Sequence, residues 1–366
     1  MNVTIERKKL IDVLSLGGSL AGKAKTMEIL NYAKVVIKSN NTMLVSSSDN
    51  QGFITNRTSV LSTDGEGQFC VEPTLMLKAL KTLKEEQVTL NISDAKIVCK
   101  REKGVMEFPV TSAEEYITFT SSSDVQTYEI DSEKLFEWCN TAKFFTSAEN
   151  IRPILCGMLL YAKGNEIGCC ATDSQKLYAD FYTTENEING ELRAVIPNVV
   201  LPLLCQVING TDTAKISVDA KNITIKGNDA KLSVKLIEGN YPNFKAVIPL
   251  NNNINVTTST SEFIDCITRI SLFASATPAL KIEVSGMDMK LTCEDIMMSR
   301  KATDDMWVEH SDGDITIGAN SEFLLQILRN VLSEKATLNL NDATRPILVK
   351  DEDRPNKTLL CMPIML

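Results

Sequence analysis

The sequence predicts an α+β protein of three tandem repeats, each with two helices packed on antiparallel sheets. The first observation is that a short strand followed by an amphipathic helix begins at Val3, at Tyr128 and at Val256. The second is that each helix is followed by short strands joined by Asn- or Gly-containing turns, which are typical of antiparallel hairpins. Three copies of one plan, about 125 residues apart, are a stronger signal than any single motif. We therefore base the domain organisation on the repeat.

The first half of each repeat is defined by its helix. Apolar residues at helical spacing predict the three helices. These residues are Leu10, Ile11 and Leu14, then Leu135, Phe136 and Cys139, then Phe263, Ile264, Ile267 and Ile270. The strand pairs that follow are predicted to turn at residues 40–41, 163–165 and 286, because Asn and Gly accept the left-handed conformation that tight turns require. Each helix must bury its apolar side on the sheet that follows it.

The second half of each repeat has the same order of elements. Strands lead into helices at residues 68–71, 194–196 and 315–317. The apolar positions of these helices are Leu75, Leu80 and Leu83, then Val199, Leu203, Leu204 and Val207, then Phe323, Leu324, Ile327 and Val331. Strand pairs follow at residues 88–97, 214–225 and 336–348.

Polar stretches separate the repeats at residues 121–124 and 251–253. Clusters of Ser, Asn and Asp between periodic segments are typical of linkers. The predicted domains are therefore residues 1–124, 125–251 and 252–366.

The charge balance and the apolar pattern limit the class of protein. The 366 residues include 38 Lys+Arg and 47 Asp+Glu, a formal net charge of -9. Proteins that hold nucleic acid by affinity usually carry a basic excess, so this balance argues against a protein that grips phosphates. No stretch reaches the roughly 18 apolar residues of a membrane span, and the first residues lack a signal-peptide run. We expect a cytoplasmic protein.

The side-chain inventory argues against catalysis and metal binding. His310 is the single histidine, which removes most histidine-based zinc sites and leaves few possible catalytic dyads. The ten cysteines include no Cys-x-x-Cys pair, and Cys139, Cys205 and Cys266 lie in apolar stretches, as small buried hydrophobes do. We therefore predict reduced thiols, no catalytic residue, no metal site and no cofactor.

One segment is similar to a phosphate-binding loop. Residues 17–24 read GGSLAGKA, but a P-loop follows a buried strand and has Ser or Thr after its lysine. Here a helical pattern precedes Gly17, and Ala24 follows Lys23. A glycine loop that ends a helix is the favoured interpretation. An NTP-binding enzyme that uses this loop is the alternative, which nucleotide binding lost in Lys23→Ala would support.

Two apolar segments suggest how copies of the chain associate. Residues 105–109 (VMEFP) look like an apolar edge strand of the first repeat, and Leu272 and Phe273 follow the first helix of the third repeat. Contact between these segments in different copies would be heterologous and, made twice, would close a ring. We predict a dimer interface at Met106, Phe108, Leu272 and Phe273. The alternative is that both segments are ordinary core.

Four segments carry a resemblance to a known family. They read RPILCGM at 152–158, ATDSQKL at 171–177, LIEGNYPNF at 236–244 and MPIML at 362–366. With these motifs, its length and its threefold plan, the whole chain resembles the bacterial sliding clamp, the β subunit of the DNA polymerase III holoenzyme. The resemblance implies the DNA-clamp fold.

The resemblance implies a protein without enzymatic activity. In the family a head-to-tail homodimer forms a ring of six domains, helices line its hole, and double-stranded DNA passes through it regardless of sequence. The ring is a processivity factor that a clamp loader complex opens with ATP. It tethers the DNA polymerase III alpha subunit and other proteins that carry a clamp-binding motif. Topology then holds the DNA, which reconciles this role with a net charge of -9. A peptide-binding scaffold unrelated to DNA is a further alternative.

The resemblance also implies a pocket between the second and third domains. Partners insert a short peptide there, typically a Gln followed by Leu and Phe-like residues, and apolar side chains with an adaptable methionine can seat such anchors. Carried over by motif, the pocket consists of Leu155, Thr172, Ser174, Gln175, Lys176, Leu177, Pro242, Val247, Asn320, Phe323, Leu360, Met362 and Pro363. The candidates for DNA contact are Lys23, Lys25 and Arg152.

This chain departs from the family at the pocket. Ser174-Gln175-Lys176 stands where the family commonly has Gly-His-Arg. The tail at 364–366 (IML) lacks the usual basic residue. These departures predict an altered peptide preference. Pro153 and Ile154 also stand where the family has tyrosines near the start of the second domain's strands, which argues against aromatic contacts to DNA.

Overall fold

The structure, a computed structural model, describes residues 1–24, 27–101, 104–119 and 125–366. It divides into two compact units, one formed by Met1–Cys139 with Val199–Leu236 and the other by Asn140–Asn198 with Ile237–Leu366. The middle repeat contributes to both units, because its strands complete a sheet in each of them. The polar stretch 121–124, which we predicted as the first boundary, lies outside the described residues.

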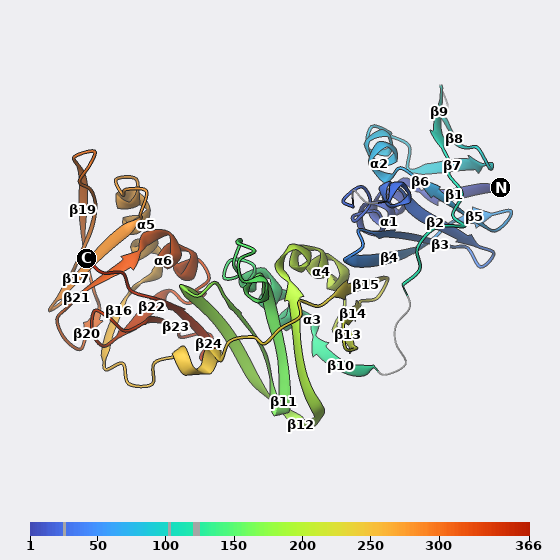
Figure 1. Cartoon of the computed structure of the whole chain (residues 1–366). Helices are drawn as coiled ribbons and strands as arrows, with labels where there is room; N and C mark the ends of the chain where they lie inside the picture. Colours follow the sequence, from blue (N-terminus) through green and yellow to red (C-terminus); the bar gives the residue numbers. More distant parts are fainter. Residues whose placement is uncertain (25–26, 102–103, 120–124) are drawn as a thin grey trace. The chain divides into compact units, whose positions relative to one another are not determined.

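In the first unit the strands and helices follow the predicted order (Figure 1). The first repeat consists of β1 (Asn2–Glu6), α1 (Arg7–Gly17), the 3-10 helix η1 (Glu28–Asn31), β2 (Ala33–Lys38), β3 (Thr42–Ser48), β4 (Gly52–Ser59), β5 (Ser62–Thr63), β6 (Gly67–Val71), α2 (Pro73–Lys81), β7 (Gln87–Ile92), β8 (Lys96–Arg101) and β9 (Gly104–Pro109). The middle repeat adds β10 (Gln126–Asp131), most of α3 (Ser132–Ala142), α4 (Leu201–Ile208), β13 (Thr213–Val218), β14 (Asn222–Lys226) and β15 (Ala230–Lys235).

Two antiparallel sheets form the first unit, and the two halves of the first repeat exchange strands between them. The smaller sheet has the order β5-β1-β7-β8-β9, and the larger has the order β10-β13-β14-β15-β4-β3-β2-β6. In the smaller sheet Val3 of β1 lies opposite Leu90 of β7. In the larger one Cys70 of β6 lies opposite Lys34 of β2. Each sheet is incomplete without a strand from the other half, so the two halves fold as one body.

The larger sheet passes from the first repeat into the middle repeat through β4 and β15. Ile54 of β4 lies opposite Leu232 of β15, and both side chains are fully buried. Arg57 pairs with Asp229 beside them at 3.0 Å, but both partners are exposed. Because exposed ion pairs contribute little, burial of the apolar strand faces is what holds the two repeats together.

The second unit begins with the long hairpin of the middle repeat, clearly visible in Figure 1. Its first elements are the 3-10 helix η2 (Pro153–Leu155), β11 (Gly157–Thr172), β12 (Lys176–Pro197) and the 3-10 helix η3 (Asn198–Val200), which leads into α4. The 3-10 helix η4 (Phe244–Val247) precedes the third repeat. The third repeat consists of β16 (Ile254–Ser259), α5 (Thr260–Ser271), β17 (Ala279–Ser285), β18 (Asp288–Asp295), β19 (Arg300–Trp307), β20 (His310–Ser311), β21 (Ile315–Asn320), α6 (Ser321–Leu328), β22 (Lys335–Leu340), β23 (Ile347–Asp351) and β24 (Lys357–Cys361).

Strand exchange recurs in the second unit. Its sheets have the orders β11-β12-β24-β23-β22-β16-β20 and β19-β18-β17-β21, so β16 pairs with β22 and β21 pairs with β17. The last strand of the chain, β24, pairs with β12, and Leu360 lies opposite Leu177. This pairing brings the C-terminal segment beside the hairpin of the middle repeat.

The helices α1, α4 and α5 pack on strands that follow them, as predicted, and α4 packs on β14 and β15. α1 packs on β3 and β4, and α5 packs on β18 and β19. In α3 the buried face differs in one position from the predicted one: Phe136 is 44% exposed, whereas Trp138 is fully buried. Trp138 lies three residues after Leu135 and shares its face, while Phe136 is rotated by one residue, about 100°, around the helix.

The turn predicted at residues 163–165 is wrong. β11 continues through this stretch opposite β12, and shifts in register on both sides of Gly164 mark a β-bulge. Gly164 has φ 60°, which suits a bulge as well as a turn. The chain reverses instead at residues 173–175. The other two predicted turns are present, with positive φ at Asn41 and Gly286.

No helix among the described residues combines the length and the apolar character needed to cross a membrane. α5 is the longest of the described α-helices with 12 residues, whereas a spanning helix needs about 20.

The cysteines lead to a prediction of chemical reactivity. Burial raises the pKa of Cys70 and Cys293 to about 11 and that of Cys361 to about 12, because the thiolate loses its hydration. Only Cys156 and Cys205 are half-buried among the ten cysteines. We expect a thiol reagent such as DTNB at about pH 8 to label at most these two in the folded chain, since thiolate and access are both required. Labelling of Cys361 before denaturation would contradict the structure.

Candidate functional site

A cavity of about 430 Å³ with a largely apolar wall opens in the second unit. Two 3-10 helices, the end of the β11–β12 hairpin and the C-terminal segment surround it. The lining residues are Arg152, Ile154, Leu155, Thr172, Ser174, Gln175, Lys176, Leu177, Pro242, Asn243, Phe244, Val247, Leu360 and Met362. Leu155, Leu177 and Leu360 are buried. A concave apolar site with a few polar groups is typical of ligand binding.

The helix η4 forms a preformed wall of this cavity. The ring of Phe244 stacks on that of Phe181 in β12, with centroids 5.4 Å apart and planes 4° apart. The next residue, Lys245, pairs with Glu166 of β11 at 2.7 Å on the exposed side. The hairpin therefore positions η4 without help from a ligand.

The hairpin end forms a second wall and has a strained turn. Asp173 Oδ1 accepts hydrogen bonds from the backbone N–H groups of Gln175 and Lys176 at 2.9 and 2.8 Å. Thr172 Oγ1 donates to the Lys176 carbonyl at 2.7 Å and accepts from the Ser174 N–H at 3.1 Å. Ser174 has φ 82°, a left-handed conformation that costs a residue other than glycine roughly 1 to 2 kcal/mol. The hydrogen bonds of Asp173 and Thr172 hold the turn against this strain.

The C-terminal segment forms a third wall. The Met362 N–H donates to the Gln175 carbonyl at 2.7 Å, and the Ile364 N–H donates to the Gly318 carbonyl at 3.0 Å. A Cβ at Gly318 would clash with the Ile364 carbonyl oxygen, so glycine is needed for the tail to approach β21. The tail is thus fixed at two points, and the side chain of Met362 lines the cavity while remaining 38% exposed.

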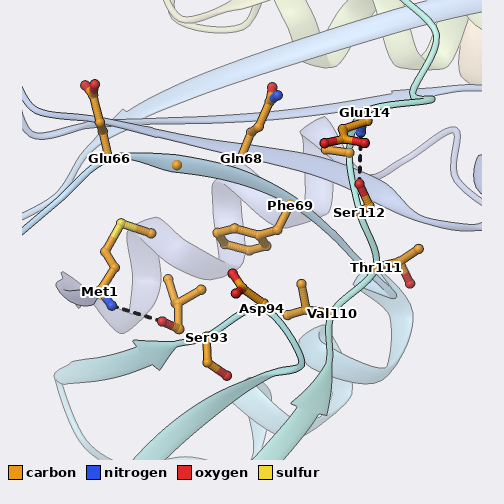
Figure 2. A pocket seen from close by; sticks show the side chains of 13 residues that line it. Met1, Glu66, Gln68, Phe69, Ser93, Asp94, Val110, Thr111, Ser112 and Glu114 are labelled. Carbon is orange, nitrogen blue, oxygen red and sulfur yellow. Dashed lines mark hydrogen bonds between the residues drawn. The ribbon is translucent and has the colours of Figure 1, made fainter.

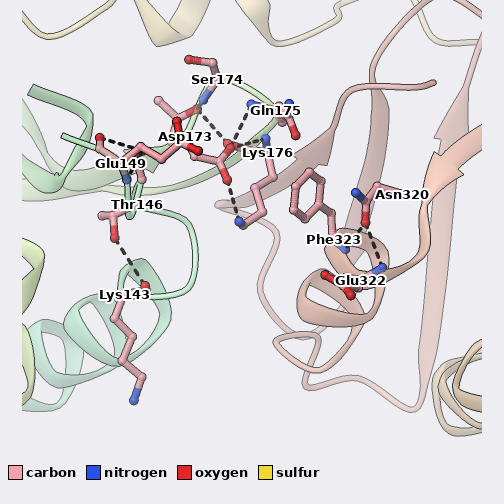
Figure 3. Close-up of polar contacts among 12 residues, drawn as sticks. Lys143, Thr146, Glu149, Asp173, Ser174, Gln175, Lys176, Asn320, Glu322 and Phe323 are labelled. Carbon is pink, nitrogen blue, oxygen red and sulfur yellow. Dashed lines mark hydrogen bonds and ion pairs between the residues drawn. The ribbon is translucent and has the colours of Figure 1, made fainter. Parts of the chain in front are cut away.

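Lys176 is a buried cation in the wall of the cavity (Figure 3). Its Nζ lies 2.6 Å from Asp173 Oδ2 and 4.5 Å from the centroid of the Phe323 ring. Phe323 lies in the first turn of α6, and its N–H donates to Oδ1 of the N-cap residue Asn320 at 3.1 Å. The Lys176 side chain therefore connects the hairpin of the middle repeat to α6 of the third.

Ten of the thirteen residues that we predicted for the pocket line this cavity. They are Leu155, Thr172, Ser174, Gln175, Lys176, Leu177, Pro242, Val247, Leu360 and Met362. Asn320, Phe323 and Pro363 do not line it, although Phe323 contacts Lys176. The lining also includes Asn243 and Phe244, which we did not predict although they belong to the LIEGNYPNF motif, and Ile154, which lies in the RPILCGM motif.

Arg152, which we predicted as a candidate for DNA contact, is exposed and also lines this cavity. Its carbonyl accepts a hydrogen bond from the Leu155 N–H at 3.0 Å, so it begins the 3-10 turn of η2 and reaches the cavity with it. Of the other two residues predicted to face DNA, Lys23 is exposed after the end of α1. Lys25 lies outside the described residues.

The glycine loop at residues 17–24 does not have the geometry of a phosphate-binding loop. The helix α1 precedes it, and the Gly18 N–H donates to the Leu14 carbonyl at 2.9 Å, which ends the helix. A Cβ at Gly17 would clash with the backbone of Val45. Both glycines thus serve the packing of a helix end, and the NTP-binding alternative has no structural support.

The segments predicted to join copies of the chain lie at or beside sheet edges. β9 and β19 are each the outermost strand of a sheet. Successive side chains of a strand point to opposite faces of the sheet. In β9 this places Phe108 in the core, where it is 5% exposed, and Met106 half-buried on the same face. This corrects the predicted place of Phe108 in an interface, because the exposed apolar residue of β9 is Val105. Leu272, just after α5, is 77% exposed, and the next residue is exposed as well.

A second cavity, of about 460 Å³, lies in the first unit (Figure 2). The amino group of Met1 donates to the Ile92 carbonyl at 3.0 Å, and Glu66, Asp94 and Glu114 also line the cavity. Among the described residues no three His, Cys, Asp or Glu side chains gather as a metal site. None of the predicted site residues lies in this cavity.

Three α+β repeats that share antiparallel sheets, with the C-terminal segment beside an apolar cavity, define the class of protein as a DNA clamp. Family models of the DNA polymerase III beta subunit match residues 1–120 with the N-terminal domain, 129–243 with the central domain and 245–365 with the C-terminal domain. The chain belongs to the DNA polymerase III beta subunit family. This confirms the predicted clamp fold and makes the chain a non-catalytic replication protein.

Relatives and solved structures match this chain over its full length. The chain is 22% identical to the beta sliding clamp of Rickettsia felis and 21% identical to that of Bacillus subtilis, over 100% of this chain and 99% of each relative. The structure of the DNA polymerase III subunit beta from Pseudomonas aeruginosa matches with a TM-score of 0.93 and 19% identity, over 100% of both chains. The beta chain from Streptococcus pneumoniae matches with a TM-score of 0.92 and 21% identity, also over 100% of both chains. At 19% and 21% identity, these two structural matches show that the chain has the same fold.

Proposed function

We propose that two copies of this chain close head to tail into a ring that encircles double-stranded DNA without sequence preference. The ring tethers the DNA polymerase III alpha subunit for processive synthesis. The observation that carries this proposal is the match of three successive clamp domains from residue 1 to residue 365. A ring holds DNA by topology, so a net charge of -9 does not oppose this function. Lys23, Lys25 and Arg152 are our candidates for DNA-facing residues.

The proposal includes three domains per chain and a loading step. We assign residues 1–124, 125–251 and 252–366 to the domains. The family's threefold division of the chain, whose second boundary falls at 243–245, supports the number of domains, and the irregular backbone at 251–253 supports the second boundary. A closed ring cannot thread onto circular DNA, so a clamp loader complex must open it with ATP. We place the protein in the cytoplasm, where bacterial replication takes place.

The sheet edges are the proposed dimer interface. The outer edges of β9 and β19 have no strand partner in the described part of the chain, and such edges pair readily with another strand. Pairing of β9 of one copy with β19 of the other satisfies these backbone groups. It also joins Val105 and Met106 to Leu272 and Phe273 in one apolar contact. The contact is heterologous and occurs twice, which closes the ring.

The cavity of the second unit is the proposed site for a partner's peptide. Leu155, Leu177, Val247 and Met362 line it and suit Leu and Phe-like anchors. Methionine adapts its shape to different ligands, which suits a site shared by the polymerase and other proteins with a clamp-binding motif. The walls are preformed, which lowers the entropic cost of binding.

Retention on DNA tests the ring. The chain is loaded by a clamp loader with ATP onto nicked circular DNA, and the complex is separated by gel filtration before and after the circle is cut. We expect the chain to remain with the circle and to be lost after linearisation, because a ring slides off free ends. Equal retention on both forms contradicts encirclement. A chain that binds a Gln-Leu-Phe-type peptide but never loads is a peptide-binding scaffold instead.

A further inference from the structure

The two internal junctions between repeats share one strand arrangement. At the first, β4 of the first repeat pairs with β15 of the middle one, and at the second, β12 of the middle repeat pairs with β24 of the third. The Lys235 N–H donates to the Gln51 carbonyl at 2.8 Å, and the Met362 N–H donates to the Gln175 carbonyl at 2.7 Å. Each glutamine directly precedes β4 or β12, so both junctions end in the same backbone hydrogen bond.

The strands of a third such junction are present in the chain without a partner. β19 follows β18 in the third repeat as β4 follows β3 in the first and β12 follows β11 in the middle one. β9 is the last strand of the first repeat, as β15 and β24 are of the other two. In the described part of the chain β9 and β19 are each the outermost strand of a sheet. A second copy of the chain can therefore complete this junction.

Equivalent positions fix how the strands of an internal junction align. Gly52 begins β4 and lies opposite Val234, and Lys176 begins β12 and lies opposite Cys361. On their other side, Val234 and Cys361 each lie opposite an isoleucine of the preceding strand. The residue that lies opposite this isoleucine in the last strand of a repeat therefore meets the first residue of the pairing strand.

The same rule gives the register of the third junction. Phe108 of β9 lies opposite Ile97 of the preceding strand, and Arg300 begins β19. The rule places the backbone of Phe108 opposite that of Arg300. Because the strands run antiparallel, the preceding residue of β9, Glu107, then lies opposite the following residue of β19, Lys301.

The backbone groups at the two free edges agree with this register. The Val110 N–H, directly after β9, donates to the carbonyl of the residue before β8 at 3.1 Å, and the Val308 N–H, directly after β19, donates to the carbonyl of the residue before β18 at 2.9 Å. In an antiparallel strand these groups alternate between the two neighbouring strands. Glu107 and Lys301, each an odd number of residues away, therefore direct their N–H and C=O groups to the free edges, where they can exchange two hydrogen bonds.

The side-chain charges favour the same register. Within one chain Glu107 pairs with Lys96 at 2.7 Å, and Lys301 pairs with Glu294 at 3.3 Å, all four side chains being exposed. Pairing of Glu107 with Lys301 joins these into a row of four alternating charges, and opposite charges directly across a strand pair are favourable. A shift by two residues, the smallest that keeps the backbone bonds, would place Glu107 opposite an uncharged residue.

Pro109 distinguishes this junction from the internal ones. It follows Phe108, so it occupies the position at which Lys235 and Met362 donate the last hydrogen bond of the internal junctions. Proline has no N–H, and the alternation along β9 directs its nitrogen to the free edge, the place where a strand accepts proline. The junction between copies therefore lacks this bond.

We propose that β9 of one copy pairs with β19 of the other in the register of the internal junctions, with Glu107 opposite Lys301, and that Pro109 leaves each intersubunit junction one backbone hydrogen bond short. The inference rests on the proposed ring and aligns its edges residue by residue. It makes the intersubunit junctions weaker than the internal ones.

Two charge reversals test the register in the full-length chain. Glu107→Lys alone places two lysines opposite each other in both junctions of a dimer, and Lys301→Glu alone places two glutamates there. We expect each variant to raise the Kd of the dimer at least about tenfold, because like charges directly opposite are unfavourable and the junction occurs twice. Sedimentation over a dilution series measures the Kd, and thermal melting checks that each variant is folded.

Co-expression of the two variants should restore the dimer. In a mixed dimer, one junction pairs Glu107 with Lys301 as in the wild type, and the other pairs the introduced lysine with the introduced glutamate. With a tag on the Glu107→Lys chain, we expect capture of more than about 80% of the untagged Lys301→Glu chains. Tagged and untagged wild-type chains are the control, which random pairing sets at about half.

Pro109→Ala tests the missing hydrogen bond. The alanine supplies an N–H at the free edge, so we expect the Kd of the dimer to fall at least about fivefold, since the bond forms at both junctions. Pro355→Ala is the matched control. It frees the unfolded chain in the same way but lies in the exposed turn between β23 and β24, so it should change the Kd by less than about twofold. A Kd for Pro109→Ala equal to or above that of the wild type overturns the role of this proline.

The outcomes separate this inference from the ring on which it rests. Random pairing of the two charge variants, together with a wild-type dimer, overturns the register and leaves the ring in place. Preferential pairing of the variants supports both the register and the head-to-tail arrangement, because only a heterologous contact makes both junctions complementary at once. A wild-type chain that is monomeric at micromolar concentration removes the proposed ring and this inference with it.

Discussion

Removal of residues 362–366 is expected to raise the Kd of a partner peptide by at least about 30-fold while the chain stays folded and dimeric. Met362 lines the cavity, and burial of one such side chain contributes roughly 1.5 to 3 kcal/mol, or about 10- to 150-fold in Kd. The truncation also removes Ile364, whose N–H fixes the tail to β21. The sheet remains because β24 ends at Cys361. Calorimetry measures the affinity and light scattering the mass.

Two further variants identify the side chain responsible. Met362→Ala should weaken peptide binding by about tenfold, because it removes the apolar contact and keeps the tail. Removal of Met365 and Leu366 alone is the matched control, since both are exposed and neither lines the cavity. Unchanged peptide affinity in the chain truncated before Met362 would refute the assignment of this cavity.

Replacement of Leu272 by Asp is expected to convert the dimer into monomers and to abolish retention on circular DNA. Leu272 follows α5 and is exposed in a single chain, so the substitution leaves the fold intact. In the proposed interface the carboxylate would be buried without a partner, at a cost of several kcal/mol. The heterologous contact occurs twice in the ring, which doubles the cost. Light scattering measures the mass, and gel filtration with nicked circular DNA measures retention.

Leu250→Asp is the control for this prediction. Leu250 is 92% exposed and lies outside both edge strands, so the same change of charge there should preserve the dimer and its retention. The Leu272→Asp monomer should still bind the partner peptide, because the cavity is formed within one chain. A Leu272→Asp chain that remains dimeric would place the interface elsewhere.

The fold was largely predictable because its signals are local and occur three times. The start of α5 is an example. Ser259 precedes apolar positions at helical spacing and has Glu262 three residues later, the pattern of a helix N-terminus. In the structure Ser259 Oγ accepts a hydrogen bond from the Glu262 N–H at 3.4 Å, and Phe263 and Ile267 are fully buried. Such contacts lie within one helical turn and need no distant partner.

The predictions that failed concern positions whose backbone conformation or burial depends on segments that are distant in the chain. Gly164 has a positive φ that suits a turn or a bulge, and its pairing with Ile188 of β12 makes it a bulge. In β9 the alternation of side chains predicts two faces, but only packing against the rest of the domain decides that Phe108 is buried in the core and Val105 is exposed.

By itself, the sequence determined the three repeats, the apolar face of most helices, the absence of a basic excess and, through its motifs, most of the cavity lining. Only the tertiary structure decided which strands exchange between half-repeats, which face of β9 is buried, and that Lys176 lies between Asp173 and the ring of Phe323. Periodicity and turn chemistry depend on neighbours in the chain. Depth of burial and the surroundings of a charged side chain depend on partners that are remote in the chain, as Phe323 is from Lys176, and these contacts exist only once the two segments have packed together.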